Sequence, residues 1–320
     1  MTRLLWALGL VLALALPASA QTYPDKPVRF VIPFPAGGAT DVVGRHVAQE
    51  LSQVLGQPVV VDNKPGASAI IGAQAVATAP PDGYTVLFAT SSVLAINAAT
   101  RTKLSDDPVK SFAPVTLVGL TPMIILVGPN SPFNTLGDLV AAAKAKPGSL
   151  HYATVSDTIR LAAEMLNERA GIKIESVPYR GAAEAYGDFY AGRIEVMFDP
   201  IPTGYPIVTS KRAKGLAVTT EKRSQMAPEV PTVAEAANLP GFDVSIWYSL
   251  VLPAGTPQPS VDKLNQAAVK ALESPDLKAK LSSPCVETRP TSPQELATFV
   301  AAELKRWSDV ARAANLVQAE

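Results

Sequence analysis

A bend with a glycine pair is the first stretch of the chain that could bind a ligand. The sequence PFPAGGATD covers residues 33–41, follows the apolar run Val28–Ile32 and opens a segment with helical spacing. Glycine tolerates positive φ and has no side chain, so the backbone turns tightly there and approaches a ligand closely. Unpaired amides at a helix start favour an anion such as a carboxylate. An ordinary strand-to-helix turn explains the same residues, because a glycine pair is weak evidence beside a full phosphate-binding motif.

A second bend, TVSDTIRL at residues 154–161, places an arginine in the first turn of a predicted helix. Ser156, Asp157 and Thr158 are each able to cap that helix. Arg160 then lies where a cation opposes the helix dipole. A bound carboxylate would compensate, because a guanidinium holds it through two parallel hydrogen bonds. The alternative is an Asp157–Arg160 ion pair on one helix, worth about 0.2–0.5 kcal/mol.

Two further bends and one tryptophan complete the candidate ligand contacts. VPYRGAA at 177–183 leads from a predicted strand into a helix through a proline and a glycine, and VMFDP at 196–200 ends a strand with an acid. Asp199 would either accept a hydrogen bond from a ligand or cap a turn. Trp247 lies in the extended run Ile246–Leu252. A tryptophan there is usually a core residue, but it would lie beside a cleft if the strand crosses between two lobes.

Groups for catalysis or metal binding are scarce. His46 and His151 are distant in sequence, and neither has a partner at metal-ligand spacing. Cys285 is the chain's only cysteine and has no motif around it, so we expect a small buried hydrophobe. The chain contains neither a Gly-x-Ser-x-Gly elbow nor a His-Glu-x-x-His motif. The sequence therefore predicts a binding protein without metal or cofactor, and an exported hydrolase acting on a carboxylated ester is the alternative.

The composition and the first residues indicate an exported globular protein. Lys and Arg number 28 and Asp and Glu also 28, a balance that argues against a nucleic-acid-binding protein with its basic excess. Hydrophobic residues make up 48% of the chain, enough for a core without disulfides. Arg3, the apolar run Leu4–Leu16 and small residues at 18–20 predict a signal peptide, residues 1–20, cleaved before Gln21. An uncleaved anchor is the alternative, although the run is shorter than the roughly 20 apolar residues that span a bilayer.

The elements that must position the bends alternate between strand and helix, a rhythm that favours a parallel sheet covered by helices. In the first part of the chain the strands are expected at 28–32, 58–61 and 85–89, and the helices at 42–55 and 70–78. In the second part the strands are expected at 150–153, 174–177, 196–198 and 216–219, and the helices at 136–145, 159–170 and 182–191.

Two long extended runs lie between these two parts, and a third run follows the second part. Val115–Leu120 and Met123–Gly128 are expected as two runs joined by Thr121-Pro122, and Ile246–Leu252 as a third. Only helices are expected after residue 257, and we expect them to cover the first sheet, since they cannot bury their apolar faces alone. The sequence thus predicts two α/β lobes with two crossings. Lobe 1 comprises residues 21–122 and 246–320, and lobe 2 comprises residues 123–245.

Short motifs spread over nearly the whole mature chain resemble those of the Bug family, the periplasmic solute receptors of tripartite tricarboxylate transporters. They are PFPAGGATD at 33–41, LGQPVVVDNKPGA at 55–67, PDGYT at 81–85, VPYRG at 177–181, MFD at 197–199, EVPTVAEA at 229–236 and LPAGTP at 252–257. The resemblance implies a two-lobed α/β periplasmic binding protein fold, type II-like, with a mainly parallel sheet flanked by helices in each lobe. It also implies a periplasmic monomer that hands a small carboxylate to membrane permease subunits and binds no nucleic acid.

In the family pattern the first bend and a facing loop of lobe 2 give amides and hydroxyls to a ligand carboxylate. With the residues singled out above, the candidate site comprises Phe34, Ala36, Gly37, Gly38, Ala39, Asp41, Ser91, Val155, Ser156, Asp157, Thr158, Arg160, Tyr179, Arg180, Gly181, Asp199 and Trp247. The chain departs from the pattern in one loop. Relatives usually have a glycine- and serine-rich loop ending in His-Leu, whereas this sequence has Arg160 where the histidine would fall.

That departure motivates a hypothesis about the ligand. An additional arginine favours a second carboxylate, and the apolar Val155 and Ile159 would line the body of a longer or aromatic diacid, such as terephthalate. The resemblance leaves open whether the closed receptor serves a permease or signals to a membrane sensor.

Overall fold

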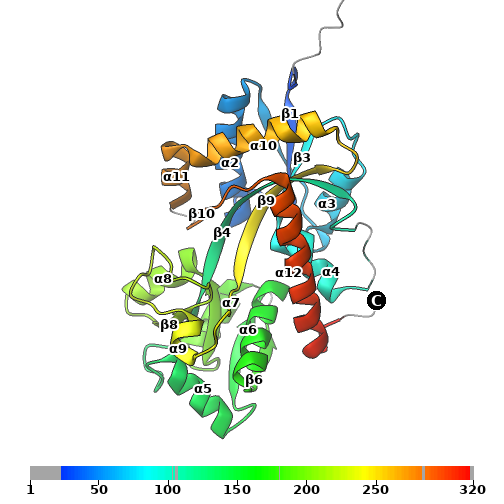
Figure 1. Ribbon diagram of the computed structural model, residues 1–320. Helices are drawn as coiled ribbons and strands as arrows, with labels where there is room; N and C mark the ends of the chain where they lie inside the picture. Colours follow the sequence, from blue (N-terminus) through cyan, green and yellow to red (C-terminus); the bar gives the residue numbers. More distant parts are fainter. Residues whose placement is uncertain (1–22, 103, 105–106, 180, 283–284, 318–320) are drawn as a thin grey trace, which may run out of the picture.

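The computed structural model describes residues 23–102, 104, 107–179, 181–282 and 285–317 (Figure 1). The predicted signal peptide, its cleavage position before Gln21 and the candidate Arg180 lie outside these residues. Within the described part, no helix combines the length and apolar character needed to cross a bilayer. The strands form one sheet with the order β2-β1-β3-β9-β4-β7-β5-β6, and β8 and β10 pair with β4.

One half of the sheet is built on three parallel strands, β1 (Val28–Ile32), β2 (Val59–Asn63) and β3 (Thr85–Thr90). The strand β9 (Ser245–Pro253) pairs antiparallel with β3, and β4 (Phe112–Val127) pairs antiparallel with β9. This half, with the helices packed on it, is called the first lobe below. The alternation predicted for this part of the chain is present, with α2 (Ala39–Leu55) and α3 (Ile70–Ala77) between the strands.

The other half of the sheet, called the second lobe, is built on the parallel strands β5 (Leu150–Thr154), β6 (Ile174–Pro178) and β7 (Val196–Pro200). Both β7 and β8 (Lys214–Val218) pair antiparallel with the end of β4. Its helices are α5 (Leu136–Ala145), α6 (Asp157–Ala170), α7 (Ala182–Tyr190), α8 (Ile201–Thr209) and α9 (Val233–Ala237). The helices α8 and α9 were not predicted.

The strand β4 is continuous, so the predicted interruption at Thr121-Pro122 is wrong. It pairs with β9 as far as Pro122, opposite Ser245, and with β7 from Met123 onward. Proline has no N–H, so it is tolerated in a strand where ladder pairing changes. Here it lies at the point where β4 exchanges the partner strand of the first lobe for those of the second.

The C-terminal part was expected to cover only the sheet of the first lobe, but it contacts both lobes. The helix α10 (Gln258–Glu273) packs on α2 and β4, followed by α11 (Pro275–Ser282). The expectation of helices alone after residue 257 is wrong, because the short strand β10 (Glu287–Thr288) pairs with β4. The last helix, α12 (Pro293–Ala313), contacts α4 (Asn97–Thr100) of the first lobe and also α6 of the second (Figure 1). It therefore links the two lobes.

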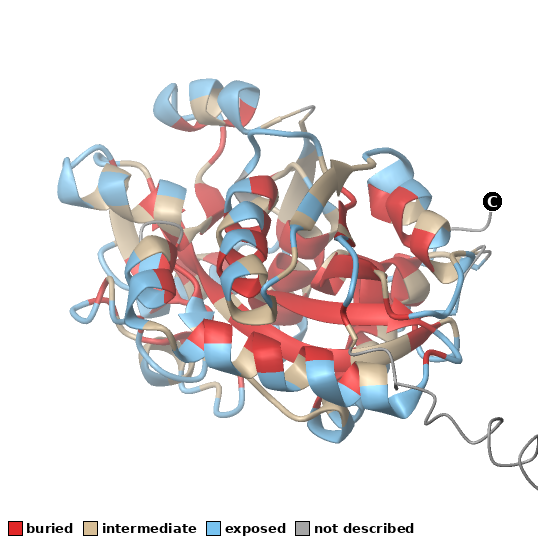
Figure 2. Cartoon of the chain, turned by 90° about the horizontal axis from the view of Figure 1, so that it is seen from above, coloured by how far each residue is buried: buried red, intermediate tan, exposed pale blue. Residues whose placement is uncertain are grey.

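The core follows the sheet through both lobes (Figure 2). Trp247 and Trp307 are its largest fully buried side chains. Their indole Nε1 atoms donate to Oε2 of the buried Glu303, at 3.0 and 3.2 Å, and Arg306 pairs with the same carboxylate at 2.7 Å. Trp247 is thus a core residue that binds α12, and not a residue beside the cleft.

Candidate functional site

The bend after β1 is held by one buried carboxylate. Asp41, 2% exposed, accepts from the Gly37 amide at 2.9 Å, from Arg45 Nε at 2.8 Å and from Asn63 Nδ2 at 2.8 Å. Burial raises the pKa of Asp41, but the hydrogen bonds from Arg45, Gly37 and Asn63 outweigh burial and lower its pKa below the usual value. Gly37 has a φ of 81°, which glycine adopts without strain. The Gly37 amide, expected as a ligand donor, is therefore bound by the protein's own oxygen.

The start of α2 stays open beside that bend. Gly38 is its N-cap residue, and no side chain caps the helix there. Helix starts leave up to four amides without intrahelical partners. Ala36, Gly37 and Gly38 are exposed, so this end of the helix faces solvent.

The bend after β5 is a conventional helix start that carries two charged side chains, Asp157 and Arg160. Ser156 caps α6, its Oγ accepting from the Ile159 amide at 3.3 Å. Among the described residues, neither the Asp157 carboxylate nor the Arg160 guanidinium has a hydrogen-bond or ion-pair partner. The Arg160 Nε atom is also buried. The alternative of an Asp157–Arg160 ion pair is therefore not present.

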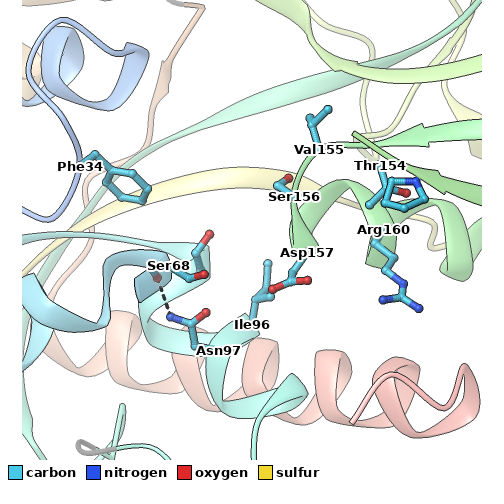
Figure 3. A pocket seen from close by; sticks show the side chains of 11 residues that line it. Phe34, Ser68, Ile96, Asn97, Thr154, Val155, Ser156, Asp157 and Arg160 are labelled. Atoms are coloured by element: carbon cyan, nitrogen blue, oxygen red, sulfur yellow. Dashed lines mark hydrogen bonds between the residues drawn. The ribbon is translucent and has the colours of Figure 1, made fainter. Parts of the chain in front are cut away.

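Residues of both lobes line a cavity of about 410 Å³ (Figure 3). Five of its lining residues were predicted, namely Phe34, Val155, Ser156, Asp157 and Arg160. Six were not, namely Ser68, Ser92, Ile96, Asn97, Thr154 and Pro178. All eleven follow or end parallel strands of the two lobes, where open α/β sheets bind their ligands.

Two of the missed residues of the first lobe, Ser68 and Asn97, are hydrogen-bonded to each other. Ser68 lies in a short 3-10 turn (Ala67–Ala69) and has a φ of 54°. Asn97 is 3% exposed and its Nδ2 donates to the Ser68 carbonyl at 2.9 Å. Among the missed residues of this lobe, Ser92 could have been found from its position just after the buried strand β3, beside β1. The π-helix that follows, Ser92–Ile96, turns Asn97 toward the cavity and has no simple sequence signature.

The remaining described candidates are not among the residues that line this cavity. Tyr179 donates to Asp188 at 2.7 Å, and Gly181 is the N-cap of α7 without a side-chain cap. Thr158 is buried. Ser91 is 1% exposed, and its Oγ has no hydrogen-bond partner within the described part of the chain. The backbone of Ala39 begins α2.

Asp199 is buried and bound internally. Its Oδ2 accepts from the Tyr186 hydroxyl at 2.8 Å and from the Thr203 hydroxyl. Burial raises its pKa above the usual range, although both hydrogen bonds oppose the shift. The acid that ends β7 is thus engaged by helices α7 and α8.

Comparison with known proteins assigns the family. The family model of the tripartite tricarboxylate transporter family receptor matches residues 43–316. The chain belongs to this family. The receptor is therefore a periplasmic solute-binding protein, and the two-lobed fold expected from the sequence is confirmed.

Two relatives show how far the likeness extends along the chain. BugT of Bordetella pertussis is 33% identical over 318 residues, covering 98% of the receptor and 97% of BugT. A protein in the tcbD-tcbE intergenic region of Pseudomonas sp. strain P51 is 37% identical over 289 residues, covering 90% and 86%.

Two similar solved structures are named with a dicarboxylate ligand, adipate in one and malate in the other. R. palustris Rpa4515 with adipate is 34% identical, with a TM-score of 0.79, covering 92% of the receptor and 98% of that chain. MatC from Rhodopseudomonas palustris, with bound malate, is 32% identical, with a TM-score of 0.75, covering 90% and 99%. The periplasmic binding protein BugD is also similar, at 32% identity and a TM-score of 0.76, covering 93% of the receptor and 100% of that chain.

Proposed function

We propose that the receptor captures a small molecule with two carboxylates between its lobes and delivers it to the permease subunits of a tripartite tricarboxylate transporter. The observation that carries this proposal is the cavity of about 410 Å³, which residues of both lobes line. One of these residues, Arg160, has no hydrogen-bond or ion-pair partner for its guanidinium among the residues that the structure describes. Ligand pockets commonly measure about 300–1,000 Å³. The cavity is therefore large enough for a diacid.

The site offers a separate electrostatic attraction to each of the two ligand carboxylates. The start of α2, which follows the cavity-lining Phe34 along the chain, carries the positive end of a helix dipole, which attracts one carboxylate. Arg160 would pair with the other carboxylate, because its planar guanidinium donates two parallel hydrogen bonds. Phe34, Ile96 and Val155 give the cavity apolar surface for the carbon skeleton, including an aromatic one such as that of terephthalate.

Calorimetric titration of the receptor with a panel of aliphatic and aromatic diacids tests the ligand class. Arg160→Ala should weaken binding of the tightest diacid by about tenfold or more, whereas Lys144→Ala removes a distant exposed charge on α5 and should leave affinity unchanged. Full affinity in Arg160→Ala would remove the assigned role of the arginine. Release of the alcohol and the free acid from a monoester of the tightest-binding diacid, during incubation with the receptor, would instead indicate a hydrolase.

We also propose that lobe 1 comprises residues 21–122 and 246–320, and lobe 2 residues 123–245, with closure about the two crossings when ligand binds. Hinge closure around an enclosed ligand is the usual motion of two-lobed binding proteins. Small-angle scattering should give a smaller radius of gyration at saturating diacid, and identical profiles would contradict closure. Native mass spectrometry of protein from the periplasm tests two further proposals. The chain mass tests cleavage before Gln21, and the mass of the intact particle tests whether the mature chain is a monomer.

A further inference from the structure

The orientation of the Asn97 amide gives the cavity a hydrogen-bond acceptor. Its Nδ2 donates to the Ser68 carbonyl at 2.9 Å. A carbonyl only accepts, so this bond fixes which end of the amide is the donor. The Oδ1 atom is left on the other side, within the cavity that Asn97 lines (Figure 3).

Asp157 places a second acceptor, with a full negative charge, on the opposite lobe. Its carboxylate has no hydrogen bond or ion pair within the described part of the chain. In Figure 3 this carboxylate points toward the side where Ile96 and Asn97 lie, whereas the Arg160 guanidinium points away from Phe34 and Ser68. The cavity therefore has an acceptor region and a separate cationic side chain.

Closure of the lobes over a simple diacid would leave these acceptors unsatisfied. The apolar Ile96, Val155 and Phe34 also line the cavity, and burying a carboxylate beside them without a partner is costly. A ligand with only carboxylates would add like-charge repulsion to that cost. A cationic donor on the ligand removes both penalties, because it pairs with Asp157 and donates to Asn97 Oδ1.

We infer that Asp157 and Asn97 Oδ1 form an ammonium subsite, so that the preferred ligand is an amino-substituted acid and not an unsubstituted diacid. This inference rests on the proposed function, because it assigns a further group to the same ligand. The charges of the site residues are opposite to those of the ligand groups that they would bind. Asp157 pairs with the ammonium, while Arg160 and the start of α2 bind carboxylates.

Titration with three probes of one skeleton tests the ammonium subsite. Glutarate, 2-hydroxyglutarate and glutamate differ only in the substituent on carbon 2, and succinate, malate and aspartate give the same comparison one carbon shorter. In at least one series the amino acid should bind about tenfold or more tighter than the unsubstituted diacid. In Asp157→Asn this ratio should fall to near one. Glu168→Gln removes an exposed charge of the same sign from the same helix and should keep the ratio.

Two results would overturn the inference. One is that the unsubstituted or the hydroxy acid binds at least as tightly as the amino acid in both series. The other is that Asp157→Asn keeps the wild-type ratio while its thermal unfolding shows an intact fold. Binding of diacids without an amino preference would refute only the ammonium subsite, whereas binding of no acid in either series or the diacid panel would refute the proposed function itself.

Discussion

Ser92 and Thr158 face each other across the gap between the lobes, with Ser92 Oγ 3.5 Å from Thr158 Oγ1. Ser92 begins the π-helix after β3, and Thr158 lies in the first turn of α6. Hydrogen bonds between hydroxyls usually measure about 2.7–2.8 Å. The contact is therefore stretched, and a small movement of the lobes toward each other would bring it to its normal length.

Removing either hydroxyl should weaken ligand binding without unfolding the receptor. Thr158→Val keeps the shape of the side chain, and we expect a loss in affinity of about three- to tenfold, the usual contribution of one neutral hydrogen bond. Ser92→Ala should cost the same. Because the two hydroxyls share one bond, the double variant should lose no more than either single variant. Additive losses in calorimetric titrations would show that the hydroxyls do not act as a pair.

Asp41 should stabilise the receptor in a pH-dependent way. Its pKa in the folded protein is lowered, so its contribution is fully present above the unfolded value of about 3.9 and is lost as the pH falls through the folded value. At pH 7 we expect Asp41→Asn to lower the free energy of unfolding by about 1–3 kcal/mol. Urea unfolding from pH 7 down to pH 3 should show the two proteins converging in stability. A constant difference would mean that the charge of Asp41 is not responsible.

Close packing of α3 against the β1 bend gives a prediction for a glycine. A Cβ at Gly72 would lie 2.5 Å from Pro33 Cβ and 2.8 Å from the Lys64 carbonyl oxygen. Gly72→Ala should therefore cost about 1–3 kcal/mol of stability. Gly187→Ala in α7 is the matched control, because a Cβ there meets none of the described residues within 4 Å. That change should raise stability by about 0.5–1 kcal/mol, and equal effects of the two changes would contradict the packing argument.

Buried Glu303 should stabilise the link between α12 and β9. It accepts from Trp247 and Trp307 and pairs with Arg306. Glu303→Leu would leave two indole N–H groups and a partly buried guanidinium without this acceptor. Breaking such a pair on one side costs about 3–5 kcal/mol. Urea unfolding followed by tryptophan fluorescence would measure the loss, and Glu303→Leu with wild-type stability would contradict the role of this carboxylate.

The alternation of apolar strands and amphipathic helices was enough to predict most elements. Val43, Val47 and Leu51 recur at every fourth position of α2 and are all buried. Pro122 misled the prediction, because a proline usually ends a strand and only the tertiary pairing shows that β4 continues past it. The strand β10, with two residues, has too little pattern to predict.

The candidate site was predicted better on the second lobe than on the first. Val155, Ser156, Asp157 and Arg160 occupy one helix start, so local sequence places them together. In the first lobe the glycine bend directed attention to exposed amides, while the cavity wall comes from Ser68 and Asn97, which are 29 residues apart. Their meeting depends on how β2 and β3 flank β1, a tertiary feature that no local motif encodes.

A crystal structure of the receptor with the tightest-binding acid of the titrations is the most direct test of the account. We expect the acid in the cavity between the lobes, with one carboxylate on Arg160 and the rest of the molecule between Ser156 and Asn97. Density for the acid elsewhere on the protein, with this cavity holding only water, would contradict the proposed site.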